Sequence, residues 1–206
     1  YIMANETKTF DDLKLSDNLL RGIYAYGFEN PSDIQYKAIP IINSKRDLIA
    51  QAQSGTGKTG SYSIGCLNNI DENINKLNLL IILPTRELVN QVYGVVSELS
   101  KYMNLKVLKV MGGTNVNECK NDLMKDNQII IGTPGRILDM IQQRYLFTES
   151  IKMVVFDEAD EILSFGFMET VYNIIKTIPV NSNIFMFSAT MPWEEIKLTE
   201  KIVNNP

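Results

Sequence analysis

Short apolar runs alternate with longer amphipathic stretches along the chain. The six runs, each closed by polar or turn-forming residues, are 47–51, 79–83, 106–110, 128–132, 153–157 and 184–188. Most of them are apolar at successive positions, so both faces of the segment must be buried, and this is typical of strands in a parallel sheet. The pattern therefore predicts a largely parallel sheet with both faces covered.

The stretches between the runs carry apolar residues at helical spacing. Two clear cases precede Gly27 and follow Thr85, and their apolar faces are Leu19, Leu20, Ile23 and Tyr24, and Leu88, Val92, Val95, Val96 and Leu99. Strands that alternate with helices predict an α/β fold, in which a mostly parallel sheet is flanked by helices on both faces. Ligands of such sheets bind beyond the carboxyl ends of the strands, so the residues that follow each run are the candidates for chemistry.

The composition narrows the chemistry of this chain. With 206 residues and 45% hydrophobic content, it fits the range of roughly 50 to 250 residues for one domain. The net charge of -4 argues against a broad cationic surface, so any contact with nucleic acid must be local. The chain has no histidine, and Cys66 and Cys119 stand outside any zinc-binding spacing. The two isolated cysteines lead us to expect a reduced, intracellular setting. We expect no membrane partner, because no apolar run approaches the roughly 18 residues that a membrane span needs.

The segment after the first run predicts a phosphate-binding loop that opens a helix to about Asn69. The six residues expected around the phosphates are Ser54, Gly55, Thr56, Gly57, Lys58 and Thr59. Loop N–H groups and the helix amino terminus can bind phosphate oxygens, Lys58 can reach the terminal phosphates, and Thr59 can offer its hydroxyl to Mg²⁺. Ala52 replaces the usual first glycine, so the prediction depends on the strand, turn and helix context. A flexible surface turn is the alternative.

An acidic pair closes the fifth run. We expect Asp157 to hold Mg²⁺ through water and Glu158 to orient and deprotonate the attacking water. The alternative is that both acids cap the next helix, where the dipole favours negative charge. Together with the phosphate loop, the pair predicts hydrolysis of a nucleoside triphosphate.

Two further segments have ordinary interpretations from their spacing alone. Ser32 and Gln35 form a capping box at a helix start. Ser188-Ala189-Thr190 indicates a turn from a strand into a helix, in which the hydroxyls serve as caps.

Taken in order, seven segments resemble the motifs of the DEAD-box RNA helicases. They are 27–35, 52–59, 84–88, 112–113, 133–136, 157–160 and 188–190. The resemblance covers nearly the whole chain and implies a RecA-like P-loop NTPase domain that binds ATP or ADP with Mg²⁺. Segments 19–28, 112–116 and 160–164 look like the initiation-factor-4A branch, while the exon-junction and ribosome-biogenesis branches stay open. Tyr36 and Phe165 depart from that branch, and Phe165 puts in doubt a partner contact made by the usual arginine.

The resemblance also implies roles for individual residues. Gln35 would pair with the adenine edge and Phe28 would stack on the base, whereas Ser188 and Thr190 would link the acidic motif to RNA. The implied catalytic residues are Lys58, Asp157, Glu158, Ser188 and Thr190. The residues implied for RNA contact are Pro84, Thr85, Arg86, Gly112, Gly113, Thr133, Pro134, Gly135 and Arg136. From the residues alone, the threonines are ordinary helix caps, the arginines are solvated and the glycines are turns.

For the domain organisation, we expect residues 1–9 to be a flexible extension and residues 10–206 to be the first RecA-like domain, without the second. The second domain supplies arginines for phosphoryl transfer in this family, so we expect this half to bind nucleotide but to hydrolyse it slowly. The expected partners are single-stranded RNA, the second RecA-like domain and a helical-repeat scaffold protein of the initiation complex. A cytoplasmic location follows, or a nuclear one for the other branches. A DNA helicase and a non-catalytic scaffold are the competing functions.

Overall fold

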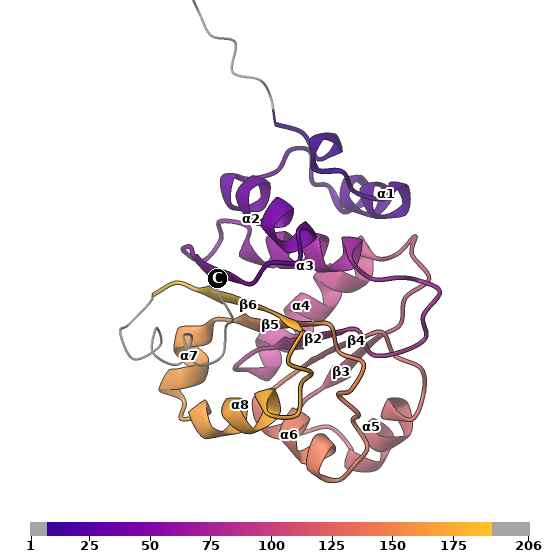
Figure 1. Ribbon diagram of the computed structural model, residues 1–206, viewed down its shortest axis with the longest axis vertical. Coiled ribbons are helices and arrows are strands. Elements are labelled where there is room, and N and C mark those ends of the chain that lie inside the picture. The colour runs from indigo at the N-terminus through magenta and orange to yellow at the C-terminus, as the bar shows by residue number, and fades with distance from the viewer. Residues whose placement is uncertain (1–7, 191–206) are drawn as a thin grey trace, which may run out of the picture.

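A six-stranded parallel sheet forms the centre of the computed structural model, which describes residues 8–190 (Figure 1). The strand order is β1-β6-β5-β2-β4-β3, and every described pairing is parallel. The strands are β1 (Leu48–Gln51), β2 (Leu79–Ile82), β3 (Val107–Val110), β4 (Ile129–Gly132), β5 (Met153–Asp157) and β6 (Asn183–Ser188). Each predicted run contains one of these strands or nearly coincides with it, so the prediction of a parallel sheet is confirmed.

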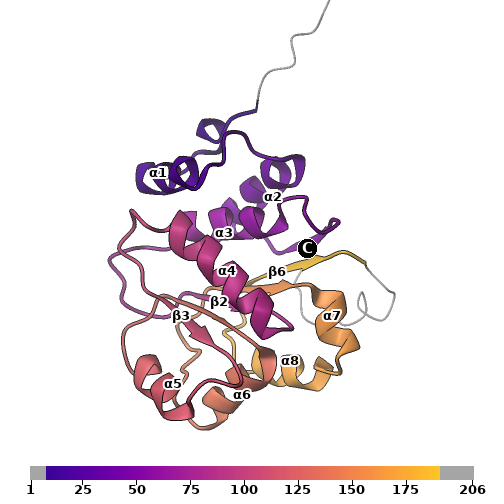
Figure 2. The same ribbon diagram turned by 180° about the vertical axis from the view of Figure 1, so that it is seen from behind.

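Helices connect the strands and cover both faces of the sheet. They are α1 (Asp17–Tyr26), α2 (Asp33–Asn43), α3 (Lys58–Asn68), α4 (Arg86–Leu99), α5 (Val116–Leu123), α6 (Pro134–Gln142), α7 (Ala159–Ser164) and α8 (Met168–Ile175), with a 3₁₀ turn at Asp11–Leu13. Gly27 ends α1 as predicted, because it adopts a φ of 97° that most side chains disfavour. Figure 2 shows α1 and α2 stacked outside α3 and α4.

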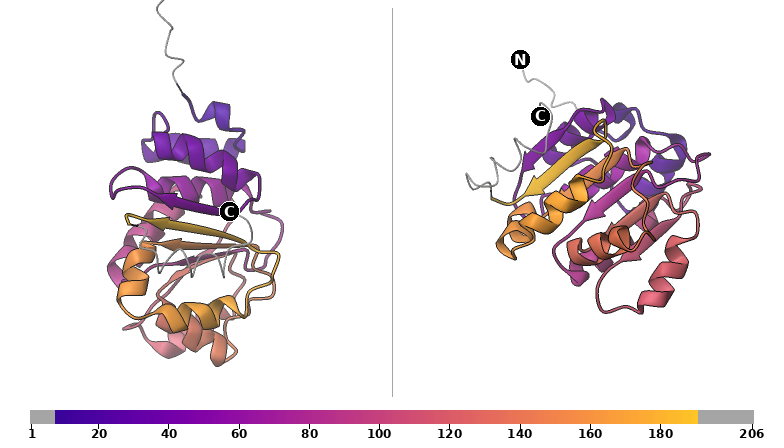
Figure 3. Two further views of the ribbon diagram at one scale, coloured as in Figure 1. Left: turned by 60° about the vertical axis from the view of Figure 1, so that its left-hand side comes forward. Right: turned by 60° about the horizontal axis from the view of Figure 1, so that its bottom comes forward.

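The strands separate two hydrophobic cores. Along β2, Leu79 and Ile81 pack into the core shared with α1–α4, whereas Leu80 and Ile82 pack into the core shared with α6–α8. Successive side chains of a strand point to opposite faces, so a strand between two cores must be apolar throughout. The left view of Figure 3 shows the sheet between these two helical layers. The prediction of an α/β sheet covered on both faces is confirmed.

Gly132 allows the ends of β3 and β4 to lie close to each other. A Cβ atom at Gly132, the last residue of β4, would lie 2.1 Å from the carbonyl oxygen of Val110, the last residue of β3. The next residue, Thr133, donates its N–H to that same oxygen at 3.1 Å. The absence of a side chain at Gly132 therefore allows the loops after β3 and β4 to begin side by side.

The helices are short relative to a lipid bilayer. The longest described helix, α4, has 14 residues, whereas a span needs about 20. Between residues 8 and 190, no helix combines the length and the apolar character needed to cross a membrane. Residues 1–7 of the extension expected at 1–9, and residues 191–206 of the domain expected at 10–206, lie outside the described residues.

Candidate nucleotide site and RNA face

The predicted site residues divide between two halves of the carboxyl edge of the sheet. The loops after β1, β5 and β6 carry the residues predicted to bind the phosphates and Mg²⁺, and we call this part the nucleotide half. The two residues predicted to bind the base, Phe28 and Gln35, come from the segment that precedes β1. The loops after β2, β4 and β3 carry the residues predicted to contact RNA, and we call this part the RNA half. Because β5 and β2 are neighbours, the two halves meet at the middle of the sheet.

The phosphate loop has the backbone conformation that its glycines allow. Gly55 has a φ of 81° and Gly57 a φ of 102°, both in the left-handed region that favours glycine. Gly57 immediately precedes α3, so the amino terminus of that helix opens toward the loop. A helix amino terminus with free N–H groups is a favourable place for phosphate.

A cavity of about 430 Å³ opens beside this loop. It collects residues from both predicted nucleotide motifs and from the segment expected to hold the base. Its lining includes Phe28, Ser54, Gly55, Gly57, Lys58, Thr59, Asp157 and Glu158. A cavity of this size is within the range of small-molecule sites.

Lys58 joins the two motifs, which lie far apart in the sequence. Its ammonium donates to both carboxylate oxygens of Glu158, each at 3.0 Å. Lys58 is only 4% exposed, so this ion pair is largely shielded from water. The structure therefore places the phosphate loop and the acidic pair in one site.

Asp157 is held on both carboxylate oxygens. Its Oδ1 accepts from the backbone N–H of Glu158 at 2.9 Å, and its Oδ2 accepts from the Tyr62 hydroxyl at 2.8 Å. Burial raises the pKa of Asp157 from 3.8 to about 6; the Tyr62 hydrogen bond, Lys58 and the Glu158 N–H oppose the shift, whereas the Glu158 charge adds to it. Tyr62 is a contact that the sequence interpretation missed, because it appeared to be an ordinary aromatic residue of a buried helix.

An unusual backbone conformation lets both acids reach the same helix. Glu158 has a φ of 50°, in the left-handed region that is uncommon for residues other than glycine. Asp157 contacts Tyr62 and Glu158 contacts Lys58, which lie about one turn apart on α3. Glu158 stands at the N-cap position of α7 but makes no capping hydrogen bond with its side chain. Simple capping therefore does not account for the pair.

The donor set around the cavity suits Mg²⁺. The Thr59 hydroxyl and the Asp157 carboxylate line the same cavity, and Mg²⁺ commonly binds one or two protein oxygens together with phosphate and water. Across residues 8–190, no group of three or more His, Cys, Asp or Glu side chains could hold a metal ion by themselves. A site that includes phosphate oxygens is therefore the arrangement that these residues fit.

The capping box at Ser32 and Gln35 is present and rests on the phosphate loop. Both reciprocal hydrogen bonds of the box form. In addition, the Ser32 hydroxyl donates to the Thr56 carbonyl at 2.9 Å, and the Gln35 amide donates to the Gly57 carbonyl at 3.4 Å. Nearby, Phe28 stacks on Phe10 with ring centroids 6.2 Å apart. The segment predicted to hold the base is thus fixed directly to the segment predicted to hold the phosphates.

Ser188 and Thr190 are tied to the acidic motif. Thr190 donates its N–H and its hydroxyl to Asp160 Oδ2 at 3.1 and 2.8 Å, and Ser188 Oγ accepts from the Asp160 N–H at 3.3 Å. Burial raises the pKa of Asp160, but these hydrogen bonds outweigh it and the net pKa is lowered. The end of β6 is therefore linked to the start of α7. The helix predicted to follow Thr190 lies outside the described residues.

The two threonines of the RNA half differ from each other. Thr85 caps α4 by accepting from the Leu88 N–H at 3.3 Å, as its position predicts. Thr133 has the equivalent position before Pro134 and Gly135 of α6, but it makes no capping hydrogen bond with its side chain. The Thr133 hydroxyl therefore does not bind the first N–H groups of its own helix.

The two arginines of the RNA half lie close to their loops. A Cβ atom on Gly113 would meet the Arg86 guanidinium, so this side chain occupies the space beside the glycine, whereas a Cβ atom on Gly112 would meet nothing. The Arg136 side chain is 12% exposed and lies 3.8 Å from Asp139. Its Nη1 is buried and has no hydrogen-bond partner among the described residues. Arg86 and Gly113, predicted separately, thus form one surface.

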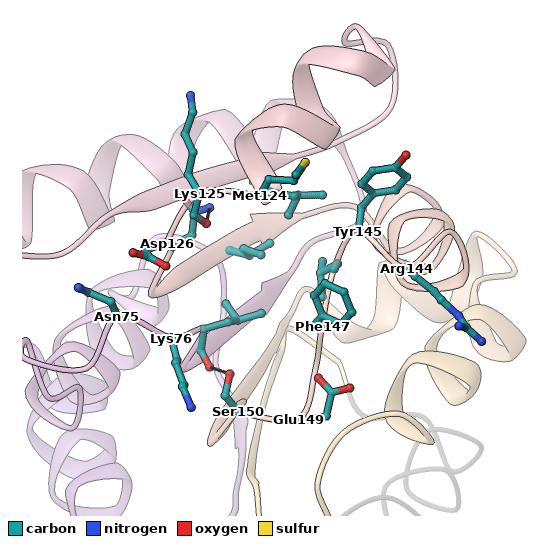
Figure 4. Close-up of a pocket in the computed structure, with 15 residues that line it drawn as sticks. Asn75, Lys76, Met124, Lys125, Asp126, Arg144, Tyr145, Phe147, Glu149 and Ser150 are labelled. Atoms are coloured by element: carbon teal, nitrogen blue, oxygen red, sulfur yellow. Dashed lines mark hydrogen bonds between the residues drawn. The ribbon is translucent and has the colours of Figure 1, made fainter.

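A larger cavity of about 650 Å³ lies away from both halves (Figure 4). Its lining comes from the loops that precede β2, β4 and β5, so it opens at the amino edge of the sheet. Met124 and Phe147, which are 76% and 64% exposed, lie on its rim. None of the predicted site residues lines this cavity. The predicted site residues therefore do not lie at the larger of these two cavities.

Comparison with known proteins shows the family of this chain. The family model for the DEAD/DEAH box helicases matches residues 32–199. The ATP-dependent RNA helicase eIF4A of Kluyveromyces lactis is 51% identical over 199 residues, which are 96% of this chain and 50% of that protein. The eIF4A of Meyerozyma guilliermondii is 45% identical over 98% of this chain and 51% of its own length. This chain therefore spans about half the length of the curated relatives it matches.

Solved structures show the same fold. A DEAD box protein from the hyperthermophile Methanococcus jannaschii superposes with a TM-score of 0.91 at 40% identity, over 95% of this chain and 54% of that one. Saccharomyces cerevisiae Dbp5 bound to RNA and ADP BeF3 gives a TM-score of 0.89 at 33% identity, over 96% of this chain and 50% of that one. The resemblance predicted from the motifs is confirmed, and the chain belongs to the DEAD/DEAH box helicase family.

Proposed function

We propose that this chain is the ATP-binding half of an ATP-dependent RNA helicase that acts in translation initiation. The observation that carries the proposal is the pair of 3.0 Å contacts between Lys58 and Glu158, which joins the phosphate loop to the acidic pair beside a suitable cavity. The names of the relatives support the initiation setting, and a cytoplasmic location goes with it.

In the proposed reaction, the residues of the cavity act on the terminal phosphate. Loop N–H groups and Lys58 bind the phosphate oxygens, and Thr59 and Asp157 would hold Mg²⁺. When bound, this ion supplies neutralisation of the charge on the transferred phosphoryl group. Glu158 orients the attacking water and accepts its proton, because it lines the same cavity as the phosphate loop.

Recognition of the base is assigned to Gln35 and Phe28. An amide can pair with N6 and N7 of adenine through one acceptor and one donor, whereas guanine has two acceptors, O6 and N7, at the same edge. Because Gln35 also touches the Gly57 carbonyl, its position is linked to that of the phosphate loop. We therefore expect ATP and ADP to bind in preference to GTP and GDP.

The RNA half is proposed to bind single-stranded RNA through its phosphates and sugars. Helix starts at Thr85 and Thr133 and the cations Arg86 and Arg136 supply local contacts, which suits a chain with a net charge of -4. The Asp160 contacts with Ser188 and Thr190 would couple this surface to hydrolysis. A second RecA-like domain would complete the site with arginines, and a helical-repeat scaffold of the initiation complex is the proposed protein partner.

The nucleotide proposal is tested with a fluorescent adenine nucleotide. The probe should bind the 206-residue chain in the presence of Mg²⁺ and be displaced by ATP but not by equal concentrations of GTP. Gln35→Ala should remove this selectivity, whereas Gln91→Ala, on the α4 wall of the same cavity, should retain it. Equal displacement by GTP would contradict the role of Gln35, and no measurable nucleotide affinity would favour the non-catalytic scaffold.

The RNA proposal needs the full-length protein. Its ATPase activity should be stimulated by single-stranded RNA and not by DNA of the same sequence, because 2′-hydroxyl contacts distinguish the two. Equal stimulation by DNA would favour the DNA helicase. The 206-residue chain alone should hydrolyse ATP slowly, and efficient RNA-stimulated turnover by this half would contradict the need for a second domain.

A further inference from the structure

Tyr62 contacts Asp157, one of the two residues that the proposed magnesium site uses. It is fully buried on α3, three residues after Thr59, and its hydroxyl donates to Asp157 Oδ2 at 2.8 Å. Residues three apart on a helix share a face, so the phenol and Thr59 both project toward the end of β5.

The phenol cannot easily move away from Asp157. Its ring packs against Phe187 of β6, with centroids 5.2 Å apart, and every part of the side chain is shielded from water. The other carboxylate oxygen of Asp157 accepts from the Glu158 N–H at 2.9 Å. One rigid donor therefore fixes each oxygen, and together they set both the rotation and the place of the carboxylate.

We propose that Tyr62 is a positioning residue that presents the Asp157 carboxylate to the hydrated magnesium ion of the nucleotide complex. This inference rests on the proposed nucleotide function. A partner that orients a metal-binding group typically contributes 10- to 100-fold to metal affinity. Phenylalanine would fill the same space but leave Asp157 Oδ2 without its rigid donor. The packing of α3 would then be retained while the orientation of Asp157 is lost.

The experiment compares Tyr62→Phe with the parent chain by titrating Mg²⁺ into mixtures of protein and fluorescent ADP. We expect the Mg²⁺ concentration at half-maximal tight binding to rise about 10-fold in Tyr62→Phe. Binding of ADP in EDTA, which does not involve the ion, should stay within twofold of the parent. Electron paramagnetic resonance of Mn²⁺ in the ADP complex gives a second measurement, and its spectrum should show weaker and less uniform binding.

Two controls separate positioning from packing. Tyr145→Phe removes a phenol at the far cavity and should leave the Mg²⁺ titration unchanged. In an Asp157→Ala background, Tyr62→Phe should have no further effect, because contacts that act through one group are not additive. A further several-fold change in that background would mean that Tyr62 does not act through Asp157 and would overturn the inference.

The outcomes for the parent chain and the variant are distinct. If the parent binds ADP equally with and without Mg²⁺, the proposed magnesium site is wrong and the inference is overturned with it. If the parent depends on Mg²⁺ and Tyr62→Phe follows the same titration within twofold, the magnesium site stands and only the role of Tyr62 is lost. A thermal melt of each variant verifies that the chain is folded in every arm.

Discussion

The two halves of the carboxyl edge differ in how far their polar groups already bind one another. In the nucleotide half, Lys58 pairs with Glu158, Asp157 accepts from Tyr62, and Asp160 accepts from Thr190. In the RNA half, Arg86 packs over a glycine, and Thr133 makes no capping hydrogen bond. The first half is a connected network, whereas the second is a series of separate contacts.

This difference matches what each half is proposed to bind. A phosphate tail and one metal ion need donors fixed within a fraction of an ångström, and a connected network supplies such preorganisation. A nucleic-acid backbone presents repeated phosphates and sugars, so separate contacts can each take one unit of it. The contrast predicts that substitutions in one half should leave the binding of the other nearly unchanged.

The largest effect is expected for Lys58→Ala. The change removes the cation proposed to bind the phosphate oxygens and leaves the charge of Glu158 unbalanced beside them, so it should cost about 3 kcal/mol, or about 100-fold, in nucleotide affinity. Fluorescence titration with an adenine nucleotide measures this loss. Binding of a uridine oligonucleotide without nucleotide should stay within twofold, and a parallel loss there would show that the halves are not independent.

Asp157→Asn tests how much the buried charge of Asp157 lowers the free energy of unfolding. The raised pKa means that the folded chain binds this proton more tightly than the unfolded chain, so the resulting stability is present below about pH 4 and is lost as the pH rises through 6. Without Mg²⁺ and nucleotide, Asn should therefore raise the free energy of unfolding at pH 7.5 by up to about 3 kcal/mol. Urea denaturation across this pH range measures the difference in free energy of unfolding between the variant and the parent chain, and this difference should disappear toward pH 4.

Asp160→Asn is the matched control for this titration. The pKa of Asp160 is lowered, so its charge contributes stability above the usual pKa and the contribution is lost as the pH falls. Asn should therefore destabilise the chain at pH 7.5. Equal signs for the two variants would contradict the assignment of burial as the main influence on Asp157.

Arg86→Ala probes the RNA half. One lost phosphate contact should weaken oligonucleotide binding about 10-fold for every sequence and make the salt dependence of log affinity shallower by about one unit. Fluorescence anisotropy at several salt concentrations gives both values. Arg21→Ala removes an arginine that packs on Tyr102 and should leave both unchanged. A sequence-dependent loss would instead indicate that Arg86 reads bases.

The smallest effects separate the two threonines. Thr85→Ala removes a helix cap and should lower the free energy of unfolding by about 1 kcal/mol, whereas Thr133→Ala should change it by less than half of that. RNA affinity should fall a few-fold in Thr133→Ala. Thermal unfolding and anisotropy on the same samples provide both readings, and equal stability losses would contradict the structural difference.

The sheet was predictable because most strands are apolar on both faces and turn-forming residues such as Pro84 and Gly132 stand at their ends. The site was predictable where one segment contains the whole motif, as in the phosphate loop. The contact between Tyr62 and Asp157 was not, because it depends on how α3 is rotated above β5. The packing of Arg86 over Gly113 depends in the same way on the distance between two loops. The spacing of residues along the chain gives neither the rotation of α3 nor the distance between these two loops.

The left-handed backbone at Glu158 bears on how mutational scans of this position should be interpreted. Residues branched at Cβ strongly disfavour a φ of 50°, whereas glycine and asparagine accept it. Variants from a library at this position would therefore differ in the yield of soluble protein as well as in activity. Valine or threonine there would report on the fold of the turn, and glutamine is the cleaner substitute for asking what the carboxylate does.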